Sequence, residues 1–453
     1  MIFSDQELAQ WSGGKLVHRG PNGPISTDSR RIGNGDWFLA LVGERFDGHD
    51  FLPMAAEADC AGVIAERVPE NWSKGFIQVS DTLHALQEIA GHARKNLSTP
   101  VVGITGSAGK TTTRAMVGLV LEELGSVHQT AGNLNNHIGL PLSIVRAPID
   151  AAVWVLELGM NAPGEIDLLQ RICEPQIRLI TNVGAAHLEG LGTIEGVAKA
   201  KAELFDGSKP GDICCINMDD PYIRDMAIPE NVRVIRYGRD PSCEVCLTDA
   251  ELEPTSLSTI FRIETPHGVV RGRIDNPGLH LAANATAAVA VGVAMRVSTD
   301  GMAERLGRYE AVGMRQRLEP GPRGSQVIND AYNANPISMR ASLETLAALQ
   351  SGRRIALLGD MLEMGEASHD AHLDIANIAL SLGIEIVGLA GPAFQAVVSD
   401  LSPTSTQLLS AENAEQLAEL LRDQIHPNDL ILLKGSRGMA MERILRILKT
   451  EEE

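Results

Sequence analysis

Short apolar runs alternate with longer amphipathic segments along most of this chain. Runs suited to buried parallel strands lie at residues 101–105, 153–158, 179–183, 213–217 and 232–237. Helical patterns at 114–124 and around 197–205 separate some of them. This alternation predicts a doubly wound α/β domain in the middle of the chain.

The pattern differs on either side of this segment. Residues 1–97 are punctuated by glycine, with short strands expected at 37–42 and 61–65 and a helix at 82–95, and residues 97–100 are typical of a linker. Beyond Gly313 a second α/β unit is expected. Its strands are predicted at 326–330, 355–358, 385–389 and 430–433, and its helices at 336–349, 369–382 and 439–448. We therefore predict an α/β protein of three domains, bounded as 1–97, 98–313 and 314–453.

Composition and charge narrow the range of partners. The 453 residues are 44% hydrophobic and 21% charged, which excludes a mostly disordered chain. Subtracting 58 acidic from 39 basic residues gives a net charge of −19, which disfavours nucleic acid and anionic membranes as partners. No run approaches the roughly 20 apolar residues of a membrane span, and the N-terminus lacks a basic signal region. We expect a cytoplasmic monomer.

The cysteines suggest no chemistry of their own. Six cysteines are too few for a disulfide framework in a chain of this length. Cys243 and Cys246 have the spacing of a redox or metal pair, but no second pair or nearby histidine completes a zinc site. A structural role is the favoured interpretation.

A glycine-rich segment, residues 103–113 (GITGSAGKTTT), follows an apolar strand and opens a helix. Its glycines let backbone N–H groups face a phosphate chain, and the helix N-terminus favours negative charge. Lys110 can then neutralise phosphate oxygens, and the Thr111 hydroxyl can bind Mg²⁺. Ile104 stands where the general phosphate loop has its first glycine. A GTPase would carry an Asn-Lys-x-Asp element, which the sequence lacks, so ATP is the expected nucleotide.

This variant loop, with Thr105 before it and three threonines after it, resembles that of the Mur ligases. Other segments resemble the family's motifs in the same order along nearly the whole chain: 132–141 (GNLNNHIGLP), 157–159 (ELG), 181–189 (TNVGAAHLE), 197–201 (VAKAK), 280–288 (HLAANATAA), Arg315, Asp330 and 434–437 (KGSR). The resemblance implies a small UDP-binding domain, a central phosphate-loop ATPase domain and a C-terminal Rossmann-like domain that binds the incoming amine.

Residues 330–336 (DAYNANP) and 359–365 (GDMLEMG) look like motifs of one branch of the family, as do 26–30 and 43–49 near the N-terminus. That branch joins D-alanyl-D-alanine to UDP-N-acetylmuramoyl-tripeptide through an acyl phosphate. Residues 275–278 (DNPG) are similar to a motif of the diaminopimelate-adding ligase, but Gly278 replaces its arginine. We interpret that segment as a turn.

The resemblance also implies roles for individual residues. ATP would be bound by Thr105, Gly106, Ser107, Ala108, Gly109, Lys110, Thr111, Thr112, Asn284, Arg315 and Asp330. The acceptor and dipeptide would contact Ser29, Arg30, Asn133, Asn135, Asn136, Asn333 and Asn335. Two Mg²⁺ ions would be held by Thr111, Glu157, His187 and a carbamylated Lys201, and the catalytic groups would be Lys110, His187, Lys201 and Arg315.

Several of these residues have plainer interpretations. Glu157 and His187 follow strand ends, where an α/β sheet presents its ligands, but each could be a hydrogen-bonded structural residue. The asparagines at 333 and 335 could cap a helix, and Ser29–Arg30 could be a charged surface turn. Lys199 competes with Lys201, but two residues on a helix are about 200° apart, so only one can face the metal.

Two other functions remain open on these residues. A folylpolyglutamate synthase-like ligase would share the loop and central domain, although the N-terminal region with Asp28–Arg30 argues against it. A nucleotide-gated scaffold would bind ATP through the same loop without making an amide. Whether the tripeptide carries lysine or diaminopimelate is not encoded in these motifs.

Overall fold

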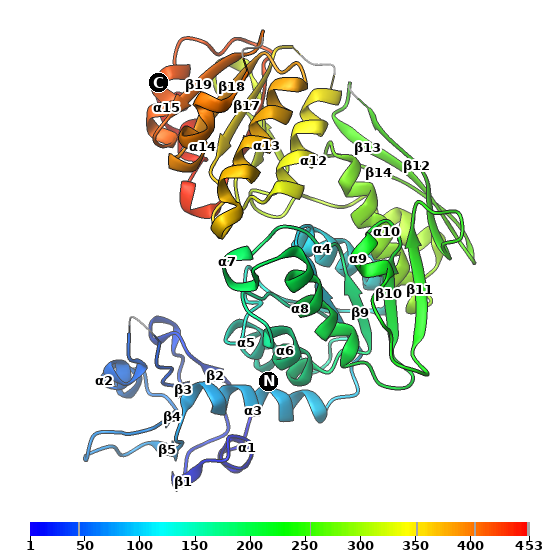
Figure 1. Cartoon of the computed structure of the whole chain (residues 1–453). Coiled ribbons are helices and arrows are strands. Elements are labelled where there is room, and N and C mark those ends of the chain that lie inside the picture. The colour runs from blue at the N-terminus through cyan, green and yellow to red at the C-terminus, as the bar shows by residue number, and fades with distance from the viewer. Residues whose placement is uncertain (44–45, 254, 350–351, 403–404, 451–453) are drawn as a thin grey trace. The chain divides into compact units, whose positions relative to one another are not determined.

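A computed structural model describes residues 1–43, 46–253, 255–349, 352–402 and 405–450 (Figure 1). The segment 43–49 is therefore described without Glu44 and Arg45, and the acidic tail Glu451–Glu453 also lies outside the described residues. By their internal contacts the residues form two compact units. Residues 1–103, 124–159 and 164–177 make up unit 1, and residues 104–123, 160–163 and 178–453 make up unit 2.

The N-terminal region is built on a five-stranded sheet of order β1–β5–β4–β3–β2, in which only β1 is antiparallel to its neighbour. The strands are β1 Lys15–His18, β2 Ile25–Ser26, β3 Trp37–Leu39, β4 Gly62–Ala65 and β5 Gly75–Gln78. The helices are α1 Asp5–Trp11, α2 Leu52–Glu57 and α3 Thr82–Lys95. Phe38, Val63 and Phe76 are buried in one core with Leu52 of α2.

The middle of the chain contributes a nine-stranded sheet of order β14–β13–β12–β11–β10–β9–β6–β8–β7. Its strands are β6 Val101–Thr105, β7 Val127–Gln129, β8 Val153–Glu157, β9 Ile177–Ile180, β10 Ile213–Asn217, β11 Arg233–Gly238, β12 Val245–Glu253, β13 Ser258–Thr265 and β14 Gly268–Ile274. Its helices are α4 Lys110–Leu121, α5 Gly139–Val145, α6 Glu165–Cys173, α7 Leu188–Leu191, α8 Ile194–Asp206, α9 Pro221–Arg224, α10 Leu279–Ala294 and α11 Thr299–Leu306.

The C-terminal region has a six-stranded sheet of order β15–β16–β20–β17–β18–β19. The edge strand β15 is antiparallel and the other pairings are parallel. The strands are β15 Arg317–Pro320, β16 Gln326–Asp330, β17 Arg354–Gly359, β18 Ile386–Ala390, β19 Gln407–Ala411 and β20 Leu430–Lys434. The helices are α12 Pro336–Ala348, α13 Ser368–Ser381, α14 Pro392–Val397, α15 Ala414–Leu421 and α16 Arg443–Thr450.

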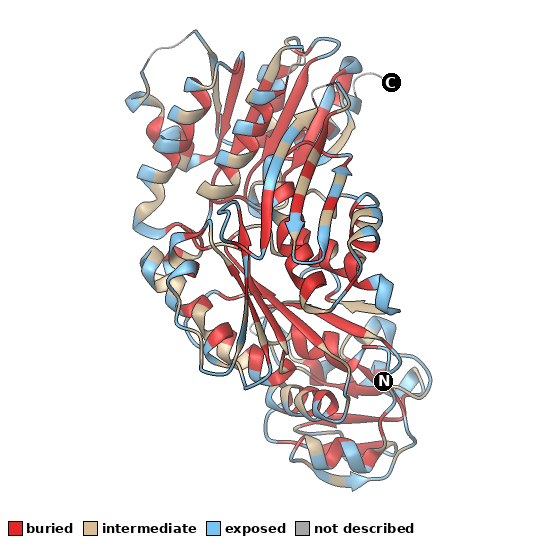
Figure 2. Ribbon diagram, turned by 90° about the vertical axis from the view of Figure 1, so that its right-hand side faces the viewer, coloured by how far each residue is buried: buried red, intermediate tan, exposed pale blue. Residues whose placement is uncertain are grey.

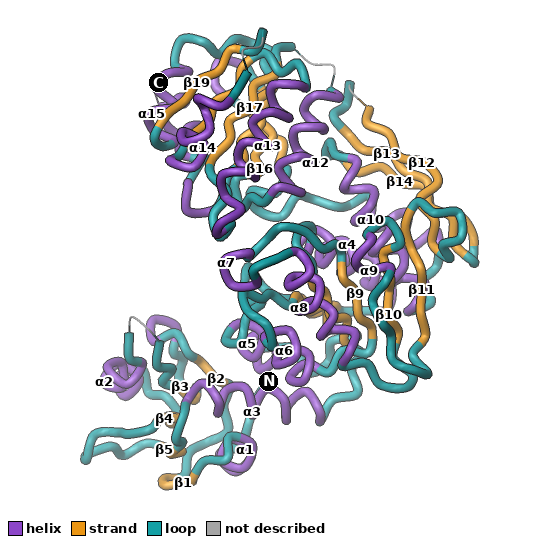
Figure 3. Tube along the Cα trace, viewed as in Figure 1, coloured by secondary structure: helices purple, strands orange, loops and turns teal. Residues whose placement is uncertain are grey.

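The alternation of strand and helix follows the sequence pattern closely (Figure 3). Strands 101–105, 213–217 and 326–330 and the helix at 82–95 have the predicted bounds. Parallel strands are buried on both faces, and Figure 2 shows most strands in red beside helices with pale outer faces. The three-domain α/β prediction is confirmed.

One part of the sheet departs from the prediction of parallel strands. Strands β12, β13 and β14 form an antiparallel meander, so the nine-stranded sheet is mixed. Their buried and exposed residues alternate irregularly, and no continuous apolar run marks them. Helix α10, which follows them, is apolar on nearly all of its faces. Its sequence therefore lacks the amphipathic period from which a helix is predicted. Residues 275–278 form the expected turn before α10.

None of the described helices is long and apolar enough to cross a membrane. Cys243 and Cys246 are buried and unoxidised, and burial raises the pKa of the Cys243 thiol to about 11. The described residues also contain no cluster of three or more His, Cys, Asp or Glu suited to a metal. The structural role of this cysteine pair stays a prediction.

A buried ion pair offers a test of the packing of unit 2. Arg178 is 1% exposed and donates to Asp212 at 3.2 Å and to the carbonyl oxygens of Leu204 and Gly207 at 2.8 Å. Asp212→Ala would remove a carboxylate that is hydrogen-bonded to a buried guanidinium, and we expect a loss of about 3 kcal/mol of stability. Urea denaturation measures this, with the exposed Asp225→Ala as the control, which should change stability by less than about 0.5 kcal/mol.

Candidate active site

The loop between β6 and α4, residues 106–109, is shaped by two glycines in unit 2. Gly106 has φ +153° and Gly109 has φ +76°, a left-handed conformation that side chains rarely adopt. Gly109 is the N-cap of α4, and no side chain caps that end. The first N–H groups of α4 are therefore positioned as an anion-binding end.

Side chains that follow β9 hold this loop in place. The Thr181 hydroxyl donates to the carbonyl oxygen of Ala108 at 2.6 Å, and the amide of Asn182 both donates to that carbonyl and accepts from the Ala108 N–H at 2.8 Å. The Ser107 hydroxyl bonds to both the N–H and the carbonyl of Gly184 at 3.0 Å. The loop's own glycines allow its curvature, and the side chains that follow β9 hold it in place.

Lys110, at the start of α4, folds back over the loop. Its ammonium donates to the carbonyl oxygen of Gly106 at 2.6 Å. Thr111 and Thr112 are 4% and 8% exposed, and both lie on the first turn of α4. The predicted phosphate-binding residues 105–112 thus form one continuous strand–loop–helix segment.

Lys201 lies on α8 and is 1% exposed, whereas Lys199 is exposed. The pKa of Lys201 is lowered well below its ordinary value, first by burial and then by the nearby charge of Lys110. An amine with a lowered pKa spends more time uncharged, and an uncharged amine is a nucleophile. The two lysines thus lie in different surroundings, as their separation of about 200° requires.

His187 is the residue before α7 and has a left-handed backbone, with φ +56°. Its Nδ1 lies 2.6 Å from Oε2 of Glu363, a residue in the loop after β17. This hydrogen bond is the main cause that lowers the pKa of Glu363, and the charges of His187 and Lys110 add to it. Lys110, Lys201, His187 and Glu363 therefore belong to one electrostatic neighbourhood within unit 2.

Mg²⁺ does not need a full cage of protein ligands. Among the described residues, no three His, Cys, Asp or Glu side chains come together as a metal cage. Mg²⁺ commonly binds through one or two carboxylates, a hydroxyl, waters and the phosphates of a substrate. The threonine hydroxyl beside the phosphate loop and an imidazole are compatible with a site completed by nucleotide oxygens.

Asp330, at the end of β16, is engaged by its own domain. Its carboxylate accepts from Lys434 at 2.5 Å, from the Ser342 hydroxyl at 2.8 Å and from the N–H of Gln316 at 3.2 Å. Lys434 also donates to the carbonyl oxygen of Asn333 at 3.2 Å. This buried pair fixes the segment 330–333 against β20.

Arg315 is half-buried and stacks on an aromatic ring. Its guanidinium carbon lies 3.6 Å from the centre of the Tyr332 ring. Stacking of this kind orients a guanidinium while leaving its N–H groups available for an anion.

Asn284 of α10 lies against the phosphate loop. Its Oδ1 accepts from the Thr113 hydroxyl at 3.2 Å, and a Cβ on Gly109 would lie 2.8 Å from that oxygen. Gly109 is therefore required both by its backbone angle and by this close approach.

The two asparagines of segment 330–336 differ. Asn335 caps α12 through its Oδ1, which accepts from the Ser338 N–H at 2.9 Å, and its amide nitrogen donates to the carbonyl oxygen of Ser107 at 3.1 Å. Asn333 has an exposed side chain. The capping interpretation thus describes Asn335, which also contacts the phosphate loop.

The remaining predicted residues belong to unit 1. Glu157 is 2% exposed, and its carboxylate accepts from the amide of Asn135 at 2.8 Å. Asn136 is exposed and accepts from the N–H of Gly139 at the start of α5, while Asn133 is also exposed.

Ser29 and Arg30 form a short 3₁₀ turn at the surface of the N-terminal region. The guanidinium of Arg30 donates to both oxygens of Asp28, at 2.9 and 3.0 Å, and this bond lowers the pKa of Asp28 to about 2. The turn is charged and exposed, as the plainer interpretation of the sequence expected.

Three residues of this neighbourhood were missed as site residues. Glu363, Lys434 and Tyr332 each fall inside a motif that the sequence displays, but none was assigned a role. A contact such as that of His187 with Glu363 joins positions 176 apart in the chain, and nothing local in the sequence marks it.

Comparisons with known proteins agree with this geometry. The sequence model described as Mur ligase middle domain matches residues 104–292, the Mur ligase, glutamate ligase domain matches 313–437, and the Mur ligase family, catalytic domain matches 24–94. The UDP-N-acetylmuramoyl-tripeptide–D-alanyl-D-alanine ligase of Bacillus subtilis (strain 168) is 36% identical over 437 residues, covering 94% of this chain and 92% of the relative.

This chain belongs to the Mur ligase family.

Solved structures of the family superpose over nearly the whole chain. A crystal structure of MurF from Acinetobacter baumannii has a TM-score of 0.90 at 30% identity and covers 99% of both chains. The MurF ligase of Thermotoga maritima, solved in complex with ADP, has a TM-score of 0.84 at 29% identity and covers 95% of this chain and 97% of its own.

The phosphate loop of this Mur ligase gives a direct test of nucleotide binding. In Gly106→Ala the new Cβ would lie 1.8 Å from the Thr181 hydroxyl oxygen, so the loop must shift. We expect the affinity for ADP to fall at least tenfold while the melting temperature changes by only a few degrees. Isothermal titration with ADP measures this. Gly91→Ala on α3, where a Cβ meets nothing within 4 Å, is the control and should bind ADP normally.

Proposed function

We propose that this chain joins D-alanyl-D-alanine to UDP-N-acetylmuramoyl-tripeptide, using ATP, in the synthesis of peptidoglycan precursors. The observation that carries the proposal is similarity over more than nine-tenths of the chain to ligases of that name, combined with a glycine-rich phosphate loop over which Lys110 folds back. We propose domain boundaries of 1–97, 98–313 and 314–453, with the UDP moiety bound by the first and the dipeptide by the last. The protein would act as a cytoplasmic monomer.

The chemistry follows from the poor reactivity of a carboxylate. Transfer of the γ-phosphoryl group of ATP to the terminal carboxylate of the tripeptide breaks the bond to ADP and forms an acyl phosphate. The amine of D-alanyl-D-alanine attacks its carbonyl carbon, and the tetrahedral intermediate expels inorganic phosphate. Because two anions must approach each other, the site needs concentrated positive charge.

Lys110 and Arg315 supply that charge in the proposal. Lys110 already lies over the phosphate loop, where exchange of the Gly106 carbonyl for a phosphate oxygen would cost little rearrangement. Arg315 is held by stacking on Tyr332 with its N–H groups free to face the transferring phosphoryl group. Asn284 would contact the adenine of ATP. Asp330, which Lys434 holds in place, would contact the ribose or phosphate side.

Thr111, Glu157, His187 and a carbamate on Lys201 would hold two Mg²⁺ ions. When bound, the ions would neutralise phosphate charge and orient the γ-phosphoryl group. The burial of Glu157 and its hydrogen bond from Asn135 would fix the orientation of its carboxylate.

Lys201 is suited to become a carbamate. Its uncharged amine would attack CO₂, forming an N–C bond and releasing one proton, and the product would carry a carboxylate in place of an ammonium. An ammonium would be repelled by Mg²⁺ and by Lys110, whereas carbamate oxygens are ligands that Mg²⁺ prefers. Burial and the charge of Lys110 lower the pKa of Lys201, which favours the uncharged form of its amine.

The acceptor and dipeptide would contact several polar side chains. Ser29 and Arg30 would meet the uridine diphosphate end, and Asn133, Asn135 and Asn136 the muramoyl part. Asn333 is exposed and would contact substrate directly. Asn335 would act by joining α12 to the carbonyl oxygen of Ser107.

Release of phosphate from ATP tests the whole proposal. We expect phosphate release only when UDP-N-acetylmuramoyl-tripeptide and D-alanyl-D-alanine are both present, with the amide product found by mass spectrometry. Separate assays with the lysine and the diaminopimelate tripeptide would identify the natural acceptor. Nucleotide binding without an amide product would instead favour the scaffold function, and activity on folate with glutamate would favour the folylpolyglutamate synthase-like one.

Lys110→Ala should lower kcat more than a hundredfold, because a charge that acts on the transferring phosphoryl group is removed. Steady-state phosphate release measures this, and circular dichroism confirms that the variant is folded. Retention of more than a tenth of the activity would contradict the role of Lys110.

Lys201→Ala should lose most of its activity and regain part of it when formate or acetate is added, because a small carboxylate can replace the missing oxygens. The exposed Lys199→Ala on the same helix is the matched control and should stay active without added acid. Rescue seen only in Lys199→Ala, or full activity of Lys201→Ala, would reject the carbamate.

A further inference from the structure

Glu363 lies in the loop between β17 and α13. The three residues before it, 360–362, are each held by hydrogen bonds to other parts of the C-terminal region. The carboxylate of Asp360 accepts from the N–H groups of Ala393 and Phe394 at the start of α14, both at 2.9 Å. The N–H of Met361 donates to the buried His372 ring at 2.9 Å.

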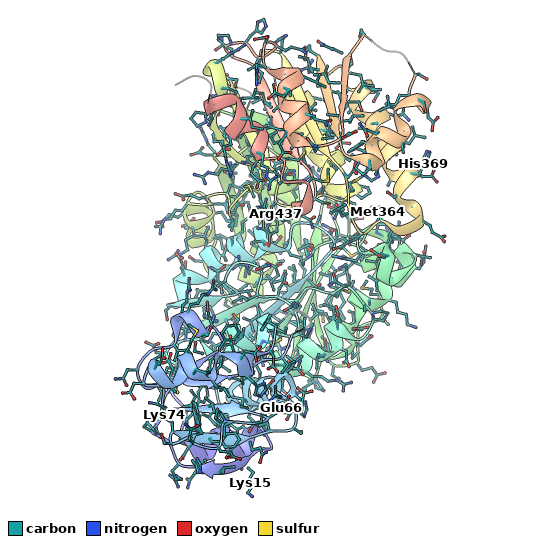
Figure 4. All side chains as sticks on the ribbon, turned by 90° about the vertical axis from the view of Figure 1, so that its left-hand side faces the viewer. Lys15, Glu66, Lys74, Met364, His369 and Arg437 are labelled. Atoms are coloured by element: carbon teal, nitrogen blue, oxygen red, sulfur yellow. The ribbon has the colours of Figure 1, made fainter. Side chains whose placement is uncertain are left out.

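The anchoring continues on both sides of Glu363. The N–H of Leu362 donates to the Ser436 hydroxyl at 2.9 Å, and Met364, labelled in Figure 4, is 3% exposed. Hydrogen bonds and burial on both sides of Glu363 therefore hold the backbone of this residue in place.

The loop also meets α7 directly, and the two lie side by side in Figure 1. The carbonyl oxygen of Glu363 accepts from the N–H of Glu189 at 3.2 Å, and a Cβ on Gly365 would lie 3.4 Å from the Glu189 Cα. The side chain of Glu363 then reaches His187, at 2.6 Å from Nδ1. Backbone and side chain of one residue thus fix the segment that carries His187.

Both residues of this pair have strained backbones. His187 has φ +56° and Glu363 has φ +63°, and a left-handed conformation costs about 1 kcal/mol or more for a residue with a Cβ. The Glu363 side chain is 56% exposed, and exposed ion pairs contribute about 0–1 kcal/mol to stability. The contact between His187 and Glu363 therefore contributes little to stability. Backbone strain of this kind is common at functional sites, where it helps to orient side chains.

We infer that Glu363 is a positioning residue that holds His187 with Nδ1 protonated and Nε2 directed as the free ligand nitrogen. A carboxylate can only accept, so the proton of this short bond lies on Nδ1. Histidines that bind metals commonly donate their other ring N–H to a carboxylate, which fixes the ring's tautomer and orientation. This inference rests on the proposed function, in which His187 is a Mg²⁺ ligand. It makes docking of the C-terminal loop on α7 a condition for a complete metal site.

The first test reads the tautomer without metal or turnover. In protein with ¹⁵N-labelled histidine, long-range ¹H–¹⁵N spectra should show His187 with Nδ1 protonated, with His187→Gln used to assign its signals. In Glu363→Ala the ring should shift toward the Nε2–H form. The exposed neighbour Glu366→Ala is the matched control and should leave the His187 signals in place.

The second test measures the metal directly. With a non-hydrolysable ATP analogue bound, we expect Glu363→Ala to weaken Mn²⁺ binding, followed by electron paramagnetic resonance, about tenfold or more, and Glu366→Ala to leave it unchanged. The melting temperature of Glu363→Ala should stay within about 2 °C of the parent.

The possible outcomes distinguish a failure of this inference from a failure of the proposed function. An unchanged tautomer together with unchanged Mn²⁺ affinity in Glu363→Ala would overturn the inference while leaving the ligase activity intact. Normal Mn²⁺ binding in His187→Ala would overturn the metal role of His187 and, with it, this inference. Absence of D-alanyl-D-alanine-dependent phosphate release by the unaltered protein would overturn the proposed function itself.

Discussion

The constraint on which the rest of unit 2 depends is the curvature of the loop between β6 and α4. A loop that offers its N–H groups to phosphate cannot use them all to stabilise itself. Its carbonyl groups and a few N–H groups are instead bonded by side chains from outside, above all by Thr181 and Asn182 at the end of β9. The next strand of the sheet therefore sets the shape of the nucleotide site.

The C-terminal domain reaches the same neighbourhood through two loops. Asn335 uses one polar atom to cap α12 and the other to contact Ser107, while Glu363 holds His187 beside α7. Both residues lie in loops that follow the C-terminal ends of parallel strands, β16 and β17. Through these two contacts, residues 335 and 363 hold residues 107 and 187 of the middle domain in place.

Two lysines of this neighbourhood, Lys434 and Lys201, are buried, and they differ in whether a carboxylate neutralises them. Lys434 is buried but neutralised by Asp330, so the pair can hold a segment in place. Lys201 is buried near a second cation, and its pKa falls because of that burial and of Lys110. Of these two buried lysines, Lys434 is paired with a carboxylate and stabilises structure, whereas in the proposed function Lys201 reacts as an amine.

Local features of the sequence determined much of this protein. Short apolar runs predicted strands such as β6, β10 and β16, and the glycines, Lys110 and Thr111 predicted the phosphate loop, because each depends on neighbours a few residues away. The antiparallel strands β12–β14 lacked such a pattern. The contacts of His187 with Glu363, of Asp330 with Lys434 and of Asn335 with Ser107 were decided only by the tertiary structure. They join residues about 100 to 230 positions apart, and only the packing of sheets and helices brings such residues within hydrogen-bonding distance.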